Sequence, residues 1–179
     1  MYSVLSVLVE NESGVLTRIA GLFSRRGFNI ESLTVGPTEN PQFARMTITV
    51  NANNAVAIEQ ITKQLHKLIN VIKITDLTET GFVDRELALI KVTSNQGTRA
   101  EIIQIADLFR GRIVDVAEDI LIVEVTGDQE KINAIVHLLS KFGLKEVART
   151  GRVALSRGVR IDPTQQPQKG VPLRMVTSN

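Results

Sequence analysis

The sequence predicts an α+β fold made of two successive βαββαβ domains. Two observations predict it: strand-like and helix-like apolar spacings follow one another in the same order twice, and the pentapeptide at residues 19–23 recurs in similar form at 105–109. The chain has 179 residues, 43% of them hydrophobic, which is enough to fill two small cores. The repeated order of elements is the stronger observation, because one pentapeptide is a short match.

The first domain is expected to open with a central strand over residues 2–10, which is apolar on both faces. A helix follows, with one apolar stripe over residues 15–23, and Gly27 ends it after two arginines that suit its carbonyl end. The remaining expected elements are strand 28–36, turn 36–41, strand 44–50, a helix over 58–69 capped by Asn53 or Asn54, and strand 71–77.

The second domain repeats this order between a strand at 86–94 and a strand at 144–150. The expected elements between them are a helix over 102–109 that ends before Gly111, strands 112–117 and 120–126 joined by a turn at Glu118-Asp119, and a helix capped by Asp128 and ended by Gly143. This order is the ferredoxin-like arrangement. We therefore divide the chain into a domain at 1–79, a domain at 80–156 and a basic tail at 157–179.

Charge and composition exclude several classes of protein. From Arg157 onward the chain has four basic residues and one acidic residue, which gives this segment a net charge of +3. The net charge of the whole chain is +2, so residues 1–156 carry a net charge of −1. The apparent basicity belongs to the tail, so a nucleic-acid-binding face is poorly supported. The absence of cysteine excludes disulfides, thiolate catalysis and a cysteine-based zinc site. No apolar run reaches the ~18 residues of a membrane span, and no basic segment precedes an apolar one at the N-terminus, so we expect a cytoplasmic protein without membrane association.

Residues 10–30 hold the best candidate for a ligand site. Asn11, Ser13 and Gly14 form the loop before the first helix, and Asn29 follows its end; we expect these polar groups to converge at the helix N-terminus. Unpaired N–H groups there favour a carboxylate, glycine allows close approach, and an amide can meet both an ammonium and a carboxylate. The alternative is that the same residues only cap the helix and form a turn.

The second domain provides an internal comparison. Aligning the two pentapeptides places Gly97 against Asn11 and Ala100 against Gly14, so that the Asn-x-x-Gly pair is absent from the second copy. A loop needed only for folding would be expected in both copies. This comparison modestly favours a ligand role for the first loop.

Neither an independent enzyme nor an RNA-binding protein is well supported. The two histidines, His66 and His137, lie in expected amphipathic helices, and no Ser-His-acid order, P-loop or dinucleotide fingerprint is present. The acidic residues near the loop are expected to be solvated charges: Glu10, Glu12 and Glu31. An RNA-binding sheet of this topology would stack bases on strand aromatics, and only Phe43 and Phe82 are near such positions.

The stretches Asn11-Glu12-Ser13-Gly14-Val15-Leu16 and Gly27-Phe28-Asn29-Ile30 resemble the amino-acid-binding ACT domain, with Asn11 where that family usually has aspartate. Residues 9–39, together with Gly97-Thr98-Arg99 and Gly111-Arg112-Ile113, resemble the regulatory small subunits of acetohydroxyacid synthase, also called acetolactate synthase. This resemblance extends over nearly the whole chain.

The resemblance implies a non-catalytic regulatory subunit without a cofactor or metal of its own. It implies a homodimer that activates a catalytic large subunit and confers feedback inhibition by valine, with thiamine diphosphate, Mg²⁺ and FAD on the large subunit. Carried over to this sequence, the valine amino and carboxylate groups would be held by Asn11, Gly14 and Asn29, and its side chain would be bordered by Val15, Leu16 and Ile30. An ACT protein that senses an amino acid and regulates a different enzyme is the alternative.

Overall fold

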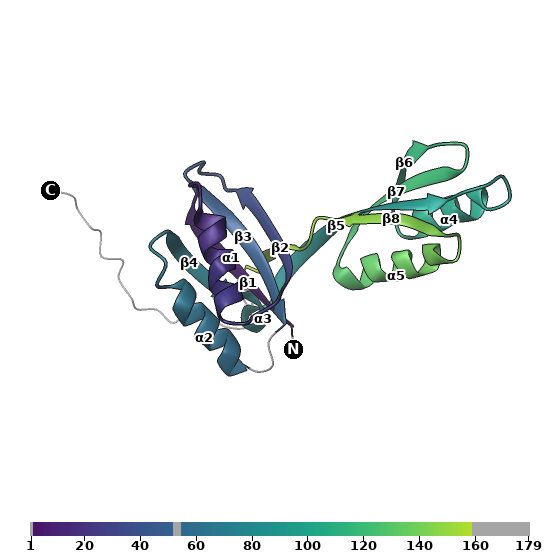
Figure 1. Cartoon of the computed structure of the whole chain (residues 1–179). Helices are drawn as coiled ribbons and strands as arrows, with labels where there is room; N and C mark the ends of the chain where they lie inside the picture. The colour runs from purple at the N-terminus through teal and green to yellow at the C-terminus, as the bar shows by residue number, and fades with distance from the viewer. Residues whose placement is uncertain (1, 52–54, 159–179) are drawn as a thin grey trace, which may run out of the picture.

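The computed structural model describes residues 2–51 and 55–158 and shows two lobes joined by one long strand, β5 (Figure 1). Each lobe has an antiparallel sheet with two helices on one face. The repeated βαββαβ order and the α+β class predicted from the sequence are confirmed.

The first lobe contains a four-stranded sheet in the order β2-β3-β1-β4. Its elements are β1 (Tyr2–Glu10), α1 (Val15–Arg25), β2 (Ile30–Pro37), β3 (Phe43–Asn51), α2 (Ala55–Leu65) and β4 (Val71–Asp76). Strand β1 lies inside the sheet between β3 and β4, and it is buried on both faces as its sequence predicts. Its odd-numbered residues from Leu5 to Val9 pack under α1 and α2 with Phe23 and Ile48. Strand β2 is left as a free edge of the sheet.

The second lobe has the same topology, in the order β6-β7-β5-β8. Its elements are β5 (Phe82–Thr93), α4 (Arg99–Leu108), β6 (Arg112–Val116), β7 (Ile120–Gly127), α5 (Gln129–Ser140) and β8 (Leu144–Arg149). Asp128 caps α5 as predicted, because its Oδ1 accepts a hydrogen bond from the Lys131 N–H at 2.8 Å. Its core joins Ile90 of β5 to Ile102 of α4 and Ile132 of α5.

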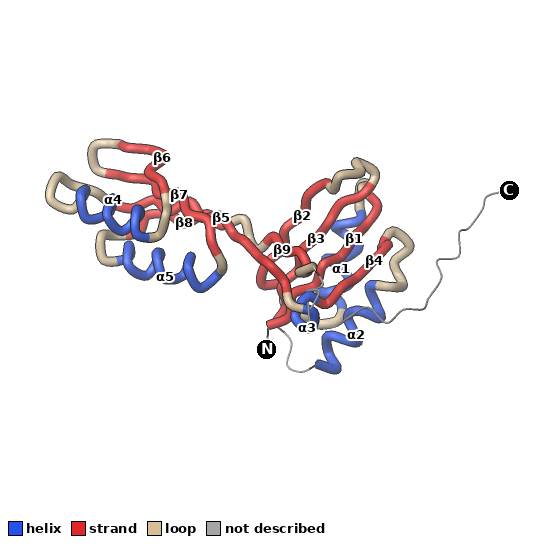
Figure 2. Tube along the Cα trace, turned by 180° about the vertical axis from the view of Figure 1, so that it is seen from behind, coloured by secondary structure: helices blue, strands red, loops and turns tan. Residues whose placement is uncertain are grey.

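Two elements are absent from the sequence-based prediction, a short helix α3 (Leu77–Thr80) and a strand β9 (Val153–Ser156). β9 pairs antiparallel with the first residues of β5, from Phe82 to Arg85, and forms a two-stranded ribbon (Figure 2). The ribbon covers the sheet face opposite α1 and α2, where Phe82 and Ala154 pack with Val4 and Leu77. Residues that follow position 80 in the sequence thus pack on the first lobe, and the domain boundary at residue 79 stays a prediction.

The second helix of the first lobe is shorter than predicted. α2 ends at Leu65, and Ile69, expected on its apolar stripe, is 89% exposed in the turn before β4. The proposed caps Asn53 and Asn54, and most of the tail from residue 159, lie outside the described residues. In the part of the chain that the structure describes, no helix combines the length and hydrophobicity needed to cross a membrane.

Candidate ligand site at the two ends of helix α1

Helix α1 begins at a glycine that leaves the helix end open. Gly14 is the N-cap residue, with φ +85° and ψ −12°, and no side chain caps the helix at this position. A Cβ on Gly14 would meet no atom within 4 Å. The N–H groups of the first turn have no partner within the helix, and the helix dipole adds partial positive charge. The α1 N-terminus can therefore accept a carboxylate.

Asn11 lies in the loop that leads to this helix end. Its backbone N–H donates to the Gln42 carbonyl at 2.8 Å, and its Nδ2 donates to the Pro41 carbonyl at 3.0 Å. Both bonds tie the loop to the β2–β3 turn. The remaining acceptor, Asn11 Oδ1, receives no hydrogen bond from the described residues and can accept one from an ammonium group.

A polar cluster beside the same helix end was not predicted from the sequence. Asn70 is buried; its Oδ1 accepts from Arg18 Nη1, and its Nδ2 donates to Glu10 Oε2 at 2.6 Å. Arg18 itself lies one turn into α1, where its N–H donates to the Gly14 carbonyl at 3.0 Å. These contacts fix the helix end against the turn before β4. They join residues far apart in sequence, so local spacing contains no signal for them.

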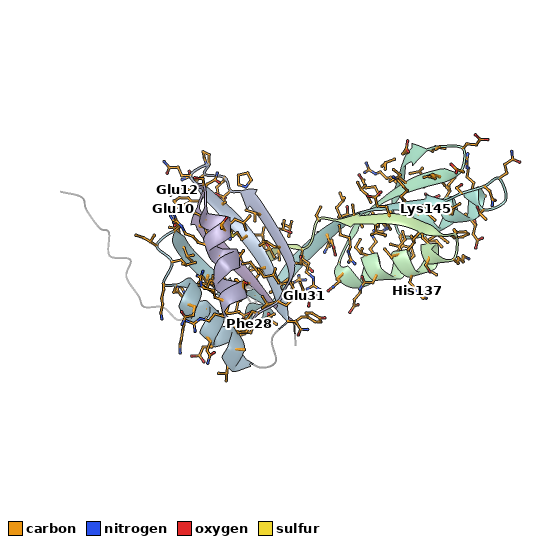
Figure 3. All side chains as sticks on the ribbon, in the orientation of Figure 1. Glu10, Glu12, Phe28, Glu31, His137 and Lys145 are labelled. Atoms are coloured by element: carbon orange, nitrogen blue, oxygen red, sulfur yellow. The ribbon has the colours of Figure 1, made fainter. Side chains whose placement is uncertain are left out.

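Asn29 lies at the opposite end of α1 within one chain. Figure 3 shows Glu10 and Glu12, which flank Asn11, at one end of the helix and Phe28 and Glu31 at the other. An eleven-residue helix is about 16 Å long, which exceeds the length of any single amino acid. The prediction that Asn11, Gly14 and Asn29 converge within one protomer is therefore wrong. Asn29 is exposed, and its Nδ2 donates to Glu31 Oε1 at 3.1 Å.

The three apolar candidates differ in how far they are available to a ligand. Val15 is 3% exposed and belongs to the core, so only its backbone faces the helix end. Ile30 is partly buried against the same core. Leu16 is 44% exposed next to Gly14 and is the best placed of the three to border a ligand side chain.

The buried residues of the two lobes show that the predicted alignment of their loops is wrong. Matching core positions lie 83 residues apart, not 86: Leu5, Val7 and Val9 match Ala88, Ile90 and Val92, and Ile19, Leu22 and Phe23 match Ile102, Ile105 and Ala106. The pentapeptide misleads because a slip of three residues turns a helix by only about 60° and keeps a similar face inward. Ser94 thus corresponds to Asn11, and Gly97 to Gly14.

In the corrected alignment the two loops still differ, but not in the presence of a glycine. Glycine is present in both, yet Gly14 adopts the left-handed conformation and Gly97 does not. Asn11 is exposed, whereas Ser94 is 1% exposed, and its Oγ accepts from Arg99 Nε at 3.3 Å. The contrast therefore lies in backbone conformation and exposure.

The other candidates from the sequence do not form a second site. His66 and His137 are both exposed, one in each lobe, and Phe82 packs in the ribbon. Over residues 2–51 and 55–158 no three His, Cys, Asp or Glu side chains are grouped so that they could hold a metal ion.

Two protein families match the two halves of the chain. Residues 5–73 match the AHAS small subunit-like ACT domain, and residues 85–158 match the family described as the small subunit of acetolactate synthase. The second match includes β9, which the ribbon places on the first lobe.

Individual relatives agree with both matches. The chain is 58% identical over 158 residues to the probable acetolactate synthase small subunit of Methanothermobacter thermautotrophicus, which covers 88% of this chain and 94% of that protein. It is 54% identical over 156 residues to the acetolactate synthase small subunit of Mycobacterium leprae, covering 87% and 92%. The crystal structure of the acetolactate synthase small subunit of Thermotoga maritima superposes with a TM-score of 0.81 at 43% identity, covering 88% of this chain and 98% of that one. The chain belongs to the acetolactate synthase small-subunit family, whose members are regulatory and leave catalysis to the large subunit.

Proposed function

We propose that this chain activates the catalytic subunit of acetolactate synthase and confers feedback inhibition by valine. The observation that supports a carboxylate ligand most strongly is the open N-terminus of α1, with Gly14 in the left-handed conformation and free space where a Cβ would be. The carboxylate would bind the first-turn N–H groups, and Asn11 Oδ1 would accept from the ammonium. Leu16 would border the valine side chain.

The separation of Asn11 and Asn29 supports a site shared between two protomers. β2 is an edge strand, so a second copy can pair side by side with it and extend the sheet. In a two-fold arrangement the facing β2 strands and α1 helices run antiparallel, which brings the N-terminus of one α1 beside the C-terminus of its partner. Gly14 of one protomer and Asn29 of the other would then face the same ligand. Such a homodimer has two equivalent sites.

The cofactors belong to the proposed complex, not to this chain. Thiamine diphosphate, Mg²⁺ and FAD would bind the large subunit, and valine binding here would change that subunit's activity through contacts between the chains. A coupling of roughly 1–3 kcal/mol would change affinity roughly 5–150-fold. The complex would be cytoplasmic.

Reconstitution with a catalytic large subunit tests this proposal. Activity is measured with the large subunit alone, with the added small subunit, and with each of valine, leucine and isoleucine. We expect the small subunit to raise activity and valine to lower it, with leucine and isoleucine weaker. Activation without any response to an amino acid would leave a regulatory subunit but remove the sensor role.

A further inference from the structure

The two lobes touch at a corner between β8 and β9, formed by residues 150–152. The Thr34 Oγ1 donates to the Thr150 carbonyl at 3.1 Å, and the Arg152 N–H donates to Ser32 Oγ at 3.2 Å. Ser32 and Thr34 lie on β2, the edge strand of the first lobe. Next to this corner a groove of about 450 Å³ separates the lobes, and the corner leads directly into the ribbon that packs on the first lobe.

Gly151 lies at the centre of the corner, where an added side chain would meet β2. Gly151 has φ +81°, and a Cβ at this position would clash with Ser32 Oγ and lie 3.0 Å from Thr34 Oγ1. Any side chain there would push the corner away from β2 or displace the two hydroxyls. The close approach of the corner to β2 depends on this residue.

The corner is held firmly on the second lobe. Arg149 forms a two-pronged ion pair with Glu86, with Nε–Oε1 and Nη2–Oε2 distances of 2.7 and 2.8 Å, and Glu86 is 5% exposed. Arg149 Nη1 also donates to Asn133 Oδ1 on α5 at 3.0 Å, and the Thr150 N–H donates to the Leu87 carbonyl at 3.1 Å. Paired charge-assisted hydrogen bonds fix orientation as well as distance. When the corner is displaced, β5, β8 and α5 should therefore move with it.

The corner contacts β2, and β2 begins directly after the proposed ligand residue Asn29. The ribbon is bonded to the inner strand β3, where the Ala154 N–H donates to Thr47 Oγ1 at 3.3 Å, whereas the corner is bonded to the edge strand. In the proposed dimer β2 also lies next to the partner's β2. It is therefore the strand on which a ligand that bridges two protomers would act.

We propose that the corner at residues 150–152 couples the effector site to the second lobe, by carrying a shift of β2 to β8 and α5. This inference rests on the proposed function for the identity of the effector, but the physical linkage it describes exists without ligand. Gly151 acts through its neighbours and is a positioning residue. Its replacement should weaken the coupling between β2 and the second lobe while leaving valine binding intact.

The test compares Gly151→Ala with Gly81→Ala in the full chain. Gly81 also has a positive φ, +71°, and a Cβ there would have no atom within 4 Å, so this control adds positive-φ strain without a clash. Amide hydrogen exchange is measured for peptides covering 30–37 and 144–156, without ligand and with saturating valine. Valine affinity is measured by calorimetry on the same samples.

Without ligand, we expect exchange in both peptides to be roughly fivefold faster or more in Gly151→Ala and to match the wild type in Gly81→Ala. With valine, the wild type should change exchange in both peptides, whereas Gly151→Ala should bind with similar affinity and change only 30–37. Thr34→Val combined with Ser32→Ala, which removes both hydroxyls without adding bulk at the corner, should also loosen it.

Ligand-free exchange in Gly151→Ala and in the Ser32/Thr34 variant that equals the wild type would overturn the coupling role. So would a valine response that reaches 144–156 undiminished in Gly151→Ala. If the wild type binds no valine, the proposed function fails, and the ligand-free comparison still decides whether the corner links the lobes.

Discussion

The two lobes share one topology but differ in the loop that leads to their first helix. In the second lobe, Asn95 Oδ1 accepts hydrogen bonds from the Gly97 and Thr98 N–H groups at 2.9 and 3.0 Å. Arg99 Nη2 then donates to the carbonyls of Ala117 and Glu118, both at 2.8 Å. The loop before α4 satisfies its own polar groups. Neither α1 nor α4 has a side-chain cap at its N-cap residue, but in the described part of the chain no side chain accepts from the backbone N–H groups of the loop before α1, which leaves donors for a ligand.

This difference indicates that the fold does not require an open loop before its first helix. The same βαββαβ unit folds with a closed loop in one copy and an open loop in the other, so the open loop is better explained by a binding role. The predictions below test this comparison, from the largest expected effect to the smallest.

Gly14→Asp should reduce valine affinity by about 100-fold or more, because the new carboxylate repels that of the ligand by roughly 4 kcal/mol at 4 Å in a partly exposed site. Calorimetric titration of valine measures the loss. The matched control is Gly14→Asn, which has nearly the same shape and tolerates the left-handed conformation without the charge. If the Gly14→Asn variant bound valine as weakly as the Gly14→Asp variant, the size of the new side chain and not its charge would account for the loss.

Asn29→Ala should weaken valine binding about tenfold, because the loss of a hydrogen bond to a charged group costs roughly 1.5 kcal/mol. Sedimentation analysis should show an intact dimer, since Asn29 is exposed and its Nδ2 contacts only the neighbouring Glu31 within the described part of the chain. A variant that becomes monomeric would instead assign Asn29 to the dimer contact.

The smallest effects should be opposite in the two loops. Asn95→Ala should lower the free energy of unfolding by about 1 kcal/mol through loss of its hydrogen bonds to the Gly97 and Thr98 N–H groups, with valine affinity unchanged. Asn11→Ala should lower the free energy of unfolding by less, because it loses only the exposed bond to the Pro41 carbonyl, and should weaken valine binding. Chemical denaturation and calorimetry on both variants give the comparison; a valine defect in Asn95→Ala would mean that the closed loop also contributes to the ligand site.

The sequence predicts the elements that depend on local periodicity and caps. The structure confirms a strand β1 that is buried on both faces, the apolar stripe of α1 and the Asp128 cap of α5. Each could be predicted because it is encoded within a few residues. β9 was not predicted, since four residues give little strand signal and its role depends on packing against β1 and β3 of the other lobe. The early end of α2 shows the same limit, because Ile69 continues the apolar pattern after the backbone has turned.

The sequence indicates which residues could form the site, but not how these residues lie relative to one another. The residue types in 10–30 indicate a helix N-terminus that a ligand can approach, and no side chain caps α1 at Gly14. The distance between Asn11 and Asn29 depends on α1 being a straight helix between them, and the support from Asn70 and Arg18 depends on the turn before β4. Neither relation is local in sequence.

The central claim, that each valine site joins the α1 N-terminus of one protomer to Asn29 of its partner, is tested most directly by mixed dimers. Gly14→Asp protomers and Asn29→Ala protomers are co-expressed with different tags, and the mixed dimer is isolated and titrated with valine. A site shared across the interface predicts one binding site of wild-type affinity per mixed dimer, because one of the two sites receives both native residues. A mixed dimer without any wild-type site would contradict the shared arrangement and the account built on it.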